Sequence, residues 1–195
     1  MDESLKLINS DMERASQRTF PGRRVVFGDG NPYSRLMLIG EAPGGDEEKE
    51  GRPFVGRAGR NLMEFLSQIE LERKDVYLTN AVKIRPFRLS PKTGKPVNRP
   101  PDRSEIDFFA QFLFKEIEAV KPDMIVTLGN VPLQTVLRDR RAQIGDSHGR
   151  IICFGENRIF PLYHPAAIIY NRALEKTYSD DIKALKEALE SGGIR

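Results

Sequence analysis

The sequence predicts an α/β fold: a three-layer αβα sandwich around a small, mostly parallel central sheet. Short apolar runs that end in turn residues alternate along the chain with segments of helical periodicity. This alternation is typical of βαβ units, in which helices cover both faces of a parallel sheet. With 195 residues the chain has the length of one domain, and we expect a single domain over residues 1–195.

The first half of the chain contains two predicted strands with a helix between them. The opening "MDESLKLINSDMERA" carries charges throughout and predicts an amphipathic helix. The run "RLMLIGE" (35–41) is short, apolar and followed by turn residues, which predicts a buried strand. "GRNLMEFLSQIE" (59–70) places its large apolar residues on one helical face, and "DVYLTNAVK" (75–83) predicts the second strand.

The middle of the chain is divided by prolines. Five prolines between residues 86 and 101 exclude a helix or a central strand there, so we expect a loop. Ser104 is the predicted N-cap of a helix that runs to Lys121. "DMIVTLGN" (123–130) predicts a third buried strand.

The last third of the chain predicts a short helix, a pair of strands and a closing helix. "VPLQTVLRDR" (131–140) has the pattern of a short helix. "GRIICFG" and "NRIFPLYHP" predict either a hairpin or two late strands. "YSDDIKALKEALES" (178–191) predicts a helix with Ser179 as its N-cap and Asp180 and Asp181 in the first turn.

The composition is that of an ordinary globular protein, with 39% hydrophobic and 30% charged residues. No apolar run reaches the length of a membrane span, and the opening segment lacks the apolar region of a signal peptide, so we expect a cytoplasmic protein. The single cysteine, Cys153, excludes disulfides and cysteine-based metal sites within one chain, and its strand-like neighbours predict a buried, inert thiol. With only His148 and His164 as histidines, we expect no metal site.

Positive charge is concentrated in one stretch of the chain. Residues 83–103 contain seven basic residues against the single acid Asp102, a local charge of +6, whereas the whole chain carries +3. The seven are Lys83, Arg85, Arg88, Lys92, Lys95, Arg99 and Arg103. A phosphate backbone would attract such a stripe, but charge alone is equally consistent with a solvated loop.

Polar or small residues follow each of the predicted parallel strands. In a parallel sheet a ligand site lies beyond the carboxyl ends of the strands. A nucleotide cofactor is excluded there, because neither a G-x-G-x-x-G motif nor a complete P-loop is present. A serine hydrolase is excluded as well, because the chain has no G-x-S-x-G elbow.

The remaining strand-end residues suit a site that binds a nucleobase. An asparagine amide, at Asn80, can pair with the donor and acceptor edge of a uracil-type ring. Phe54 offers a stacking face. His164 can donate to a ring oxygen that gains negative charge as the base departs, and Glu41 or Glu47 supplies an acid.

Three segments carry a resemblance to a known family: "GEAPGGDEEKEGRPFVGRAG", "TNAVK" and "HPAAI", in that order. Together they resemble the uracil-DNA glycosylase superfamily, most closely its family 4, the thermostable type. The likeness extends from about Val25 to Leu189. It implies a three-layer αβα fold and the excision of uracil from DNA by hydrolysis of the N-glycosidic bond, with the base flipped out.

The resemblance assigns roles to individual residues of the pocket. It implies that Phe54 stacks on uracil and that Asn80 binds its Watson–Crick edge. It also implies that His164 stabilises the departing uracilate at O2. The backbone of Gly40, Glu41 and Ala42 lines the pocket and orients water. The same resemblance and the basic stripe imply DNA contacts by Arg57, Lys83, Arg85, Ile168, Ile169, Tyr170 and Arg172, with Ile168, Ile169 or Tyr170 as the wedge.

The sequence departs from the family 4 pattern in two places, and from the best-known branch of the superfamily in a third. That pattern has four cysteines for an iron–sulfur cluster, but Ile84 and Phe109 stand at two of these positions and residues 1–24 contain no cysteine. We therefore expect no cluster and no other cofactor, with apolar packing by Ile84, Phe108 and Phe109 in its place. The segment 87–101 is longer than the usual loop, and Ala42 stands where the best-known branch of the superfamily has an aspartate.

We therefore expect a monofunctional uracil-DNA glycosylase of base excision repair. We expect it to be a monomer that acts on single- or double-stranded DNA and does not bind membranes. Without the aspartate, Glu41 is the first candidate to position water and Glu47 the second. Two alternatives stay open. One is a glycosylase for another base, such as hypoxanthine or thymine, and the other is a catalytically silent module that binds DNA or uracil.

Overall fold

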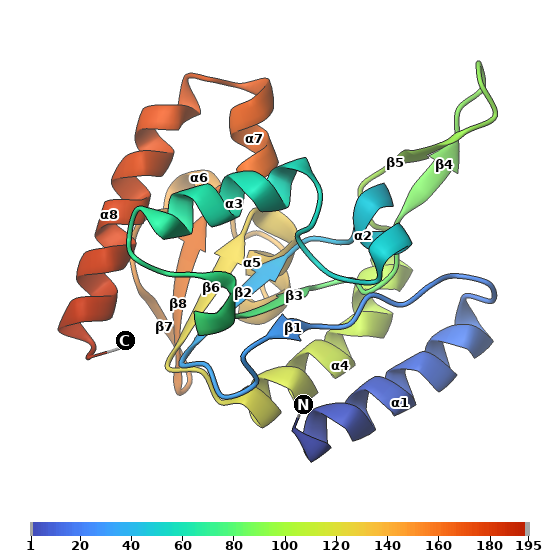
Figure 1. The fold of residues 1–195 in the computed structure, drawn as a ribbon, viewed down its shortest axis with the longest axis horizontal. Helices are drawn as coiled ribbons and strands as arrows, with labels where there is room; N and C mark the ends of the chain where they lie inside the picture. The colour runs from blue at the N-terminus through green and yellow to red at the C-terminus, as the bar shows by residue number, and fades with distance from the viewer. Residues whose placement is uncertain (1, 194–195) are drawn as a thin grey trace.

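A computed structural model describes residues 2–193 of the chain and shows a six-stranded, mostly parallel sheet (Figure 1). The strand order is β1-β3-β2-β6-β8-β7, in which β3, β2, β6 and β8 are parallel and the two edge strands are antiparallel. The strands are β1 (Asp29–Gly30), β2 (Leu36–Gly40), β3 (Tyr77–Asn80), β6 (Met124–Leu128), β7 (Ile152–Phe154) and β8 (Asn157–Leu162). The predicted sheet is confirmed, including the β7–β8 hairpin.

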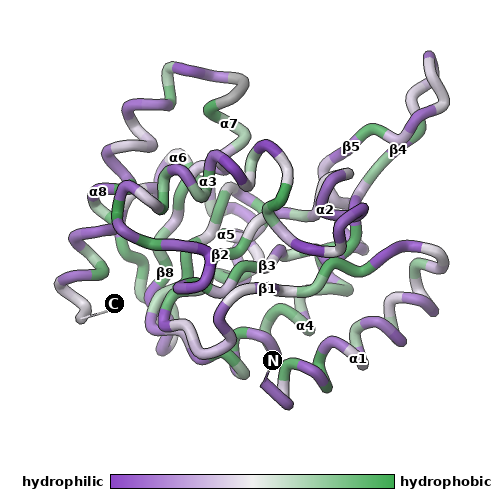
Figure 2. The backbone as a smooth tube through the Cα atoms, viewed as in Figure 1, coloured by the Kyte–Doolittle hydropathy of each residue, from purple (hydrophilic) through white to green (hydrophobic). Residues whose placement is uncertain are grey.

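Each central strand is apolar on both faces because helices cover both. Successive side chains of a strand point to opposite faces. Leu36 and Leu38 of β2 accordingly pack into one hydrophobic cluster, whereas Met37 and Ile39 pack into another. Figure 2 shows this as a hydrophobic centre under more hydrophilic helices.

The helices form the two outer layers of the predicted sandwich (Figure 1). Helices α3 (Arg57–Ser67), α7 (Pro165–Tyr170) and α8 (Leu174–Ser191) contribute to the cluster on one face. Helices α1 (Glu3–Thr19), α4 (Arg103–Val120), α5 (Asn130–Leu137) and α6 (Ile144–Ser147) contribute to the cluster on the other. The three-layer αβα prediction is confirmed.

A third cluster lies beside the sheet and joins α1 to α4. It consists of Met12, Val25, Val82, Ile84, Phe109 and Phe112. Phe20 packs on it, with its ring stacked on Phe109 at 5.8 Å and edge-on to Phe108 at 5.1 Å. This aromatic packing holds the chain after α1 against the segment that follows β3.

Two predicted helix starts are wrong. The N-cap of α4 is Asp102 rather than Ser104, and its backbone N–H donates to the Glu105 carboxylate at 2.7 Å. Helix α8 begins at Leu174, so Ser179 is not its N-cap. Asp181 therefore lies within the helix, where it is buried and lies 2.8 Å from His148 Nδ1.

Two ordered elements were not predicted, and the second of them replaces the loop expected in the proline-rich segment. The acidic run after β2 forms the short helix α2 (Gly45–Glu50), with three acidic residues in its first turn. The proline-rich segment forms the hairpin β4 (Phe87–Leu89) and β5 (Pro96–Asn98), which is separate from the main sheet. The prolines are tolerated because this two-stranded ribbon is all edge.

Cys153 is exposed on the edge strand β7, so the predicted buried thiol is wrong. The apolar neighbours Ile152 and Phe154 suggested a core strand, but β7 has a neighbour on one side only. Within residues 2–193, none of the helices is long and apolar enough to cross a membrane.

Candidate functional site

The parallel strands bring the predicted site residues to one edge of the sheet. Gly40 ends β2, and its register partner Asn80 ends β3. On the other side of β2, strand β6 ends next to Gly129, and β8 ends two residues before His164. This edge is the carboxyl edge at which open α/β sheets bind ligands.

Gly40, Phe54 and Asn80 meet at this edge. A Cβ placed on Gly40 would lie 2.6 Å from Cζ of Phe54 and would overlap the amide oxygen of Asn80. Only a glycine therefore allows the ring and the amide to approach the backbone of β2 so closely. Three residues predicted to bind the base, far apart in sequence, form one contact cluster.

Phe54 has a strained backbone. It lies in the loop between α2 and α3 with φ at 55°, a conformation that is an outlier for a bulky residue, and it is 7% exposed. Gly59 of α3 packs on it, because a Cβ there would lie 2.6 Å from the Phe54 Cα. Such strain costs about 1–3 kcal/mol and persists only where neighbours hold it.

Arg73 holds the carbonyl groups of the strained loop. Its guanidinium donates to the Pro53 oxygen at 2.7 Å and to the Phe54 oxygen at 3.4 Å. The same group binds Asp29 of β1 at 2.6 Å. Burial alone would raise the pKa of Asp29, but hydrogen bonds from Arg73 and Arg52 hold this pKa below its usual value.

Glu47 holds the amide groups of the same loop. Its Oε1 accepts from the backbone N–H of Val55 at 3.1 Å and of Gly56 at 2.8 Å, and its Oε2 accepts from Gly44 at 3.0 Å. One carboxylate thus ties the start of α2 to the start of α3. Hydrogen bonds to a charged acceptor contribute about 1.5–3 kcal/mol each, so this is a strong local constraint.

His164 is held as a neutral donor. It is the N-cap of α7, and its Nδ1 accepts from the backbone N–H of Ala166 at 3.1 Å. Burial lowers its pKa, which the charge of Glu47 partly offsets. A neutral ring that accepts at Nδ1 carries its proton on Nε2, so the free edge of the ring is a hydrogen-bond donor.

Glu41 is a half-buried carboxyl group beside the cluster, and burial raises its pKa. Within the described residues its carboxylate has no hydrogen-bond partner, in contrast to Glu47. Ala42 is half-buried next to it and contributes no acid. A desolvated, unpartnered carboxyl group at a strand end is a candidate for chemistry.

Lys83 is not at the surface, which corrects the prediction that it contacts DNA. It is fully buried in an ion pair with Glu116 of α4 and donates to Thr79 at 2.5 Å. Because a buried charge needs a partner, the pair fixes the end of β3, where Asn80 lies.

Two further predicted DNA contacts, Arg85 and Ile168, have partners within the protein, and contact of Arg85 with DNA stays a prediction. Arg85 uses its guanidinium on Glu48, on Asn98 and on the Pro96 oxygen. Ile168 is 9% exposed and packs in the core under α7, so it is not available as a wedge.

The other predicted DNA contacts divide into two groups. Arg57, at the start of α3, and Arg172, after α7, are exposed. Ile169 and Tyr170 belong to α7, but their side chains lie outside what the structure describes.

Sequence reasoning missed Arg73, Asp29 and Gly59, which together support Phe54. Arg73 lies in a short 3₁₀ helix (Arg73–Asp75) 19 residues after Phe54, and no local pattern links the two. Gly59 did have a signal, because it is the last glycine of the quoted motif.

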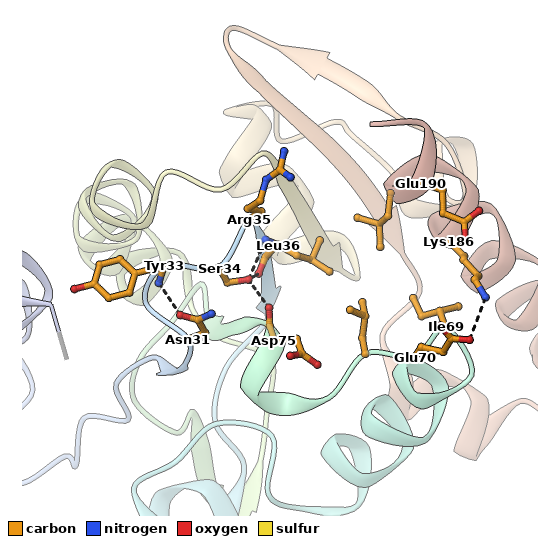
Figure 3. Close-up of a pocket in the computed structure, with 12 residues that line it drawn as sticks. Asn31, Tyr33, Ser34, Arg35, Leu36, Ile69, Glu70, Asp75, Lys186 and Glu190 are labelled. Carbon is orange, nitrogen blue, oxygen red and sulfur yellow. Dashed lines mark hydrogen bonds and ion pairs between the residues drawn. The ribbon is translucent and has the colours of Figure 1, made fainter. Parts of the chain in front are cut away.

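A large cavity lies at the opposite edge of the sheet. Its volume is about 490 Å³, and Figure 3 shows its lining side chains. They come from the amino ends of β2 and β3, from the segment after α3 and from α8, and include Leu36, Asp75 and Lys186. None of the predicted site residues lines it, so it is not the site described above.

The αβα fold and the cluster of Gly40, Phe54 and Asn80 define a class of protein, and comparison with known proteins identifies that class. The family model described as "Uracil DNA glycosylase superfamily" matches residues 27–189, and the chain belongs to this superfamily. A type-4 uracil-DNA glycosylase of Saccharolobus solfataricus is 37% identical over 180 residues, which cover 88% of this chain and 79% of that protein.

Two other relatives support the same placement. The type-4 uracil-DNA glycosylase of Thermotoga maritima is 37% identical, with 87% of this chain and 85% of that protein covered. A type-5 uracil-DNA glycosylase of Pyrobaculum aerophilum is 31% identical, with 82% and 73% covered. The predicted resemblance, including its family 4 character, is confirmed.

The residues present do not fit the iron–sulfur cluster that the family 4 pattern implies. Ile84 and Phe109, at two of the cysteine positions, are fully buried in the apolar cluster between α1 and α4. The one cysteine, Cys153, is on the far edge strand β7. Residues 2–193 also contain no group of three or more histidine, cysteine or acidic side chains that could hold a metal.

Replacing Glu47 by Gln is predicted to loosen the Phe54 loop. The carbonyl oxygen of glutamine accepts hydrogen bonds, but its NH₂ group only donates them. Glutamine therefore cannot accept both from the Gly44 N–H and from the N–H groups of Val55 and Gly56. Losing one charge-assisted bond of about 1.5–3 kcal/mol should speed local opening at least tenfold. Hydrogen exchange of the Val55 and Gly56 amides measures this opening.

Glu50→Gln is the matched control, because Glu50 is exposed on the same helix. It should leave exchange at these two amides unchanged. Unaltered exchange in Glu47→Gln would show that the carboxylate does not hold the loop.

Proposed function

We propose that this chain is a uracil-DNA glycosylase that flips uracil out of DNA and hydrolyses its N-glycosidic bond, leaving an abasic site. The observation that carries the proposal is the contact of Phe54, Asn80 and Gly40 at the carboxyl edge of the sheet. The names of the type-4 relatives support the choice of uracil.

The base is bound by the ring of Phe54 and the amide of Asn80. Stacking on an aromatic ring is worth about 1–3 kcal/mol per base. The Asn80 amide accepts from uracil N3–H and donates to O4, which cytosine cannot match at both atoms. Glu47 and Arg73 hold the Phe54 loop before the base arrives, so little ordering remains to be done on binding.

His164 stabilises the leaving group. As the bond between C1′ and N1 breaks, its electron pair stays on the uracil ring and negative charge develops at O2. A donor held by its neighbours stabilises such charge without reorganisation, and the Nε2–H of His164 is in this state because Nδ1 already accepts from Ala166.

Glu41 acts on the sugar cation and on the attacking water. Departure of uracil leaves a cationic sugar, to which the oxygen of water adds at C1′ while its proton passes to the carboxylate or to the departing base. Glu41 is suited to this because its carboxylate is unpartnered within the described residues, whereas that of Glu47 already binds three N–H groups. Glu47 acts as a positioning residue in this proposal.

The DNA strand is held by groups that flank the pocket. Arg57 and Arg172 are exposed at the start of α3 and after α7 and would bind phosphates. Ile169 or Tyr170 of α7 would fill the gap left by the flipped base.

The enzyme works without an iron–sulfur cluster in this proposal, because the aromatic cluster around Phe109 supplies the packing in its place. Elemental analysis of the purified protein should therefore find no stoichiometric iron. Iron at the level of one cluster per chain would contradict this.

The proposed form is a cytoplasmic monomer, active as a single domain over residues 1–195. It accepts single- or double-stranded DNA, because flipping costs least where a base is mispaired or unpaired.

His164→Ala is predicted to lower the rate of uracil release by about 10²–10³, the effect of removing one preorganised donor. The assay uses a labelled uracil-containing oligonucleotide, followed by alkaline cleavage of abasic sites. Because the pKa of His164 is lowered by burial, the wild-type rate should not change near pH 6.5 and should fall only at more acidic pH, where the ring gains a proton and loses its bond to Ala166.

The control is His148→Ala, which removes the histidine that pairs with Asp181 rather than the one at the strand end. It should keep uracil release within a few-fold of the wild type. Unchanged turnover in His164→Ala would remove His164 from the mechanism. Cleavage at inosine but not at uracil, or tight binding without cleavage, would replace the proposal by one of its two alternatives.

Asn80→Asp is predicted to weaken selection of uracil and shift it toward cytosine. Aspartate loses the NH₂ donor to O4 and gains an acceptor, which suits the exocyclic amine of cytosine. Release from matched oligonucleotides that contain uracil or cytosine measures the ratio. Retained uracil selectivity would show that Asn80 does not bind the base edge.

A further inference from the structure

The β4–β5 hairpin extends from the body of the protein on the side where the site lies. It begins at Phe87, seven residues after the site residue Asn80 at the carboxyl end of β3, and projects past α2 (Figure 1). Its strands pair only with each other, and residues 91–98 are all exposed. The tip is hydrophilic in Figure 2.

The free positive charge of the basic stripe is concentrated on this hairpin. Four of its seven basic residues bind acidic partners, in the pairs Lys83–Glu116, Arg85–Glu48, Arg99–Glu105 and Arg103–Asp107. The other three are Arg88, Lys92 and Lys95, which are exposed and have no acidic partner within the described residues. All three lie between Phe87 and Asn98, the two ends of the hairpin.

The base of the hairpin is fixed to the rest of the protein. Arg85 binds Asn98 at 2.7 Å and Glu48 of α2 at 3.1 Å. The Phe87 ring lies under the guanidinium of Arg23, 4.6 Å from the ring centre. An isolated two-stranded hairpin is marginally stable in water, so these contacts determine its direction. They also fix it to α2, the helix that carries Glu47.

Apolar side chains are exposed beside the free cations. Leu89 is 63% exposed and pairs in register with Pro96, while Val97 is 39% exposed and pairs with Arg88. The two pairs lie on opposite faces of the ribbon, so Arg88 and Val97 share one face, whereas Leu89 and Pro96 make the other face apolar. A surface of this kind suits a polyanion with apolar sugar edges.

We propose that the hairpin is an arm that binds duplex DNA next to the damaged base, and that it makes the enzyme favour double-stranded substrates. This inference rests on the proposed function. The three paired residues of each strand, Phe87–Leu89 and Pro96–Asn98, extend about 10 Å at roughly 3.3 Å per residue. A two-stranded ribbon fits the major groove, which is about 12 Å wide. Arg88, Lys92 and Lys95 contact phosphates, and Leu89 contacts the groove wall.

The test compares Lys92→Gln/Lys95→Gln with a matched control, Lys115→Gln/Lys121→Gln. Both control lysines are exposed, and they lie at the far end of α4, next to the amino end of β6. Binding of a uracil-containing oligonucleotide is measured as a duplex and as a single strand, over a series of salt concentrations. Uracil release is measured on the same samples.

The hairpin variant should bind the duplex about tenfold more weakly at low salt. The slope of log K against log salt should become shallower by about 0.9 for each lost phosphate contact, close to 2 for both. Single-strand binding should change less than twofold, and the control should match the wild type on both substrates. Leu89→Ser should weaken duplex binding without changing the slope.

Equal duplex binding by the hairpin and control variants would overturn the inference. The hairpin would then be a surface for a protein partner rather than for DNA. Equal losses on single and double strands would overturn the duplex preference. A wild type that binds duplex through the hairpin but releases no uracil would contradict the proposed function while sustaining the arm.

Discussion

The site depends on holding Phe54 in a backbone conformation that a phenylalanine does not adopt by itself. Glu47 binds the N–H groups of the two residues that follow Phe54. Arg73 binds the carbonyl oxygens of Phe54 and of the residue before it, so the loop is restrained from both sides. Asp29 on the edge strand in turn binds Arg73. The short strand β1, which has two residues, thereby contributes to a site at the other side of β3. The strain of one residue is supported by a network that extends across the sheet edge.

The parts of the site that depend on strand ends could be predicted from the sequence. Gly40, Asn80 and His164 each follow an apolar run, and parallel strands necessarily bring their carboxyl ends together. The residues that hold the loop could not be predicted in this way. Arg73 and Glu47 act through the backbone of other residues, and a backbone partner leaves no mark in the sequence pattern.

Charge was the weakest guide, because pairing depends on which elements become neighbours. Lys83 and Arg85 stand two residues apart in one basic stripe. The first is buried against Glu116, 33 residues later, and the second binds Glu48 of α2. Neither partner is close in sequence, so counting charges overestimated the surface potential of the stripe. The same pairing leaves its free charge on the hairpin alone.

The aromatic cluster between α1 and α4 shows how a fold can retain its shape without a metal cross-link. A cluster bound by four cysteines would join the segments that carry them through covalent bonds. Here Phe20, Ile84 and Phe109 join such segments by apolar burial and ring contacts. These contacts are strong in sum, but only close packing fixes their geometry. Rigidity near β3 then has to come from elsewhere. The buried Lys83–Glu116 pair supplies it, since a desolvated ion pair tolerates little movement of its partners, and Lys83 also donates to Thr79, which precedes Asn80 in β3.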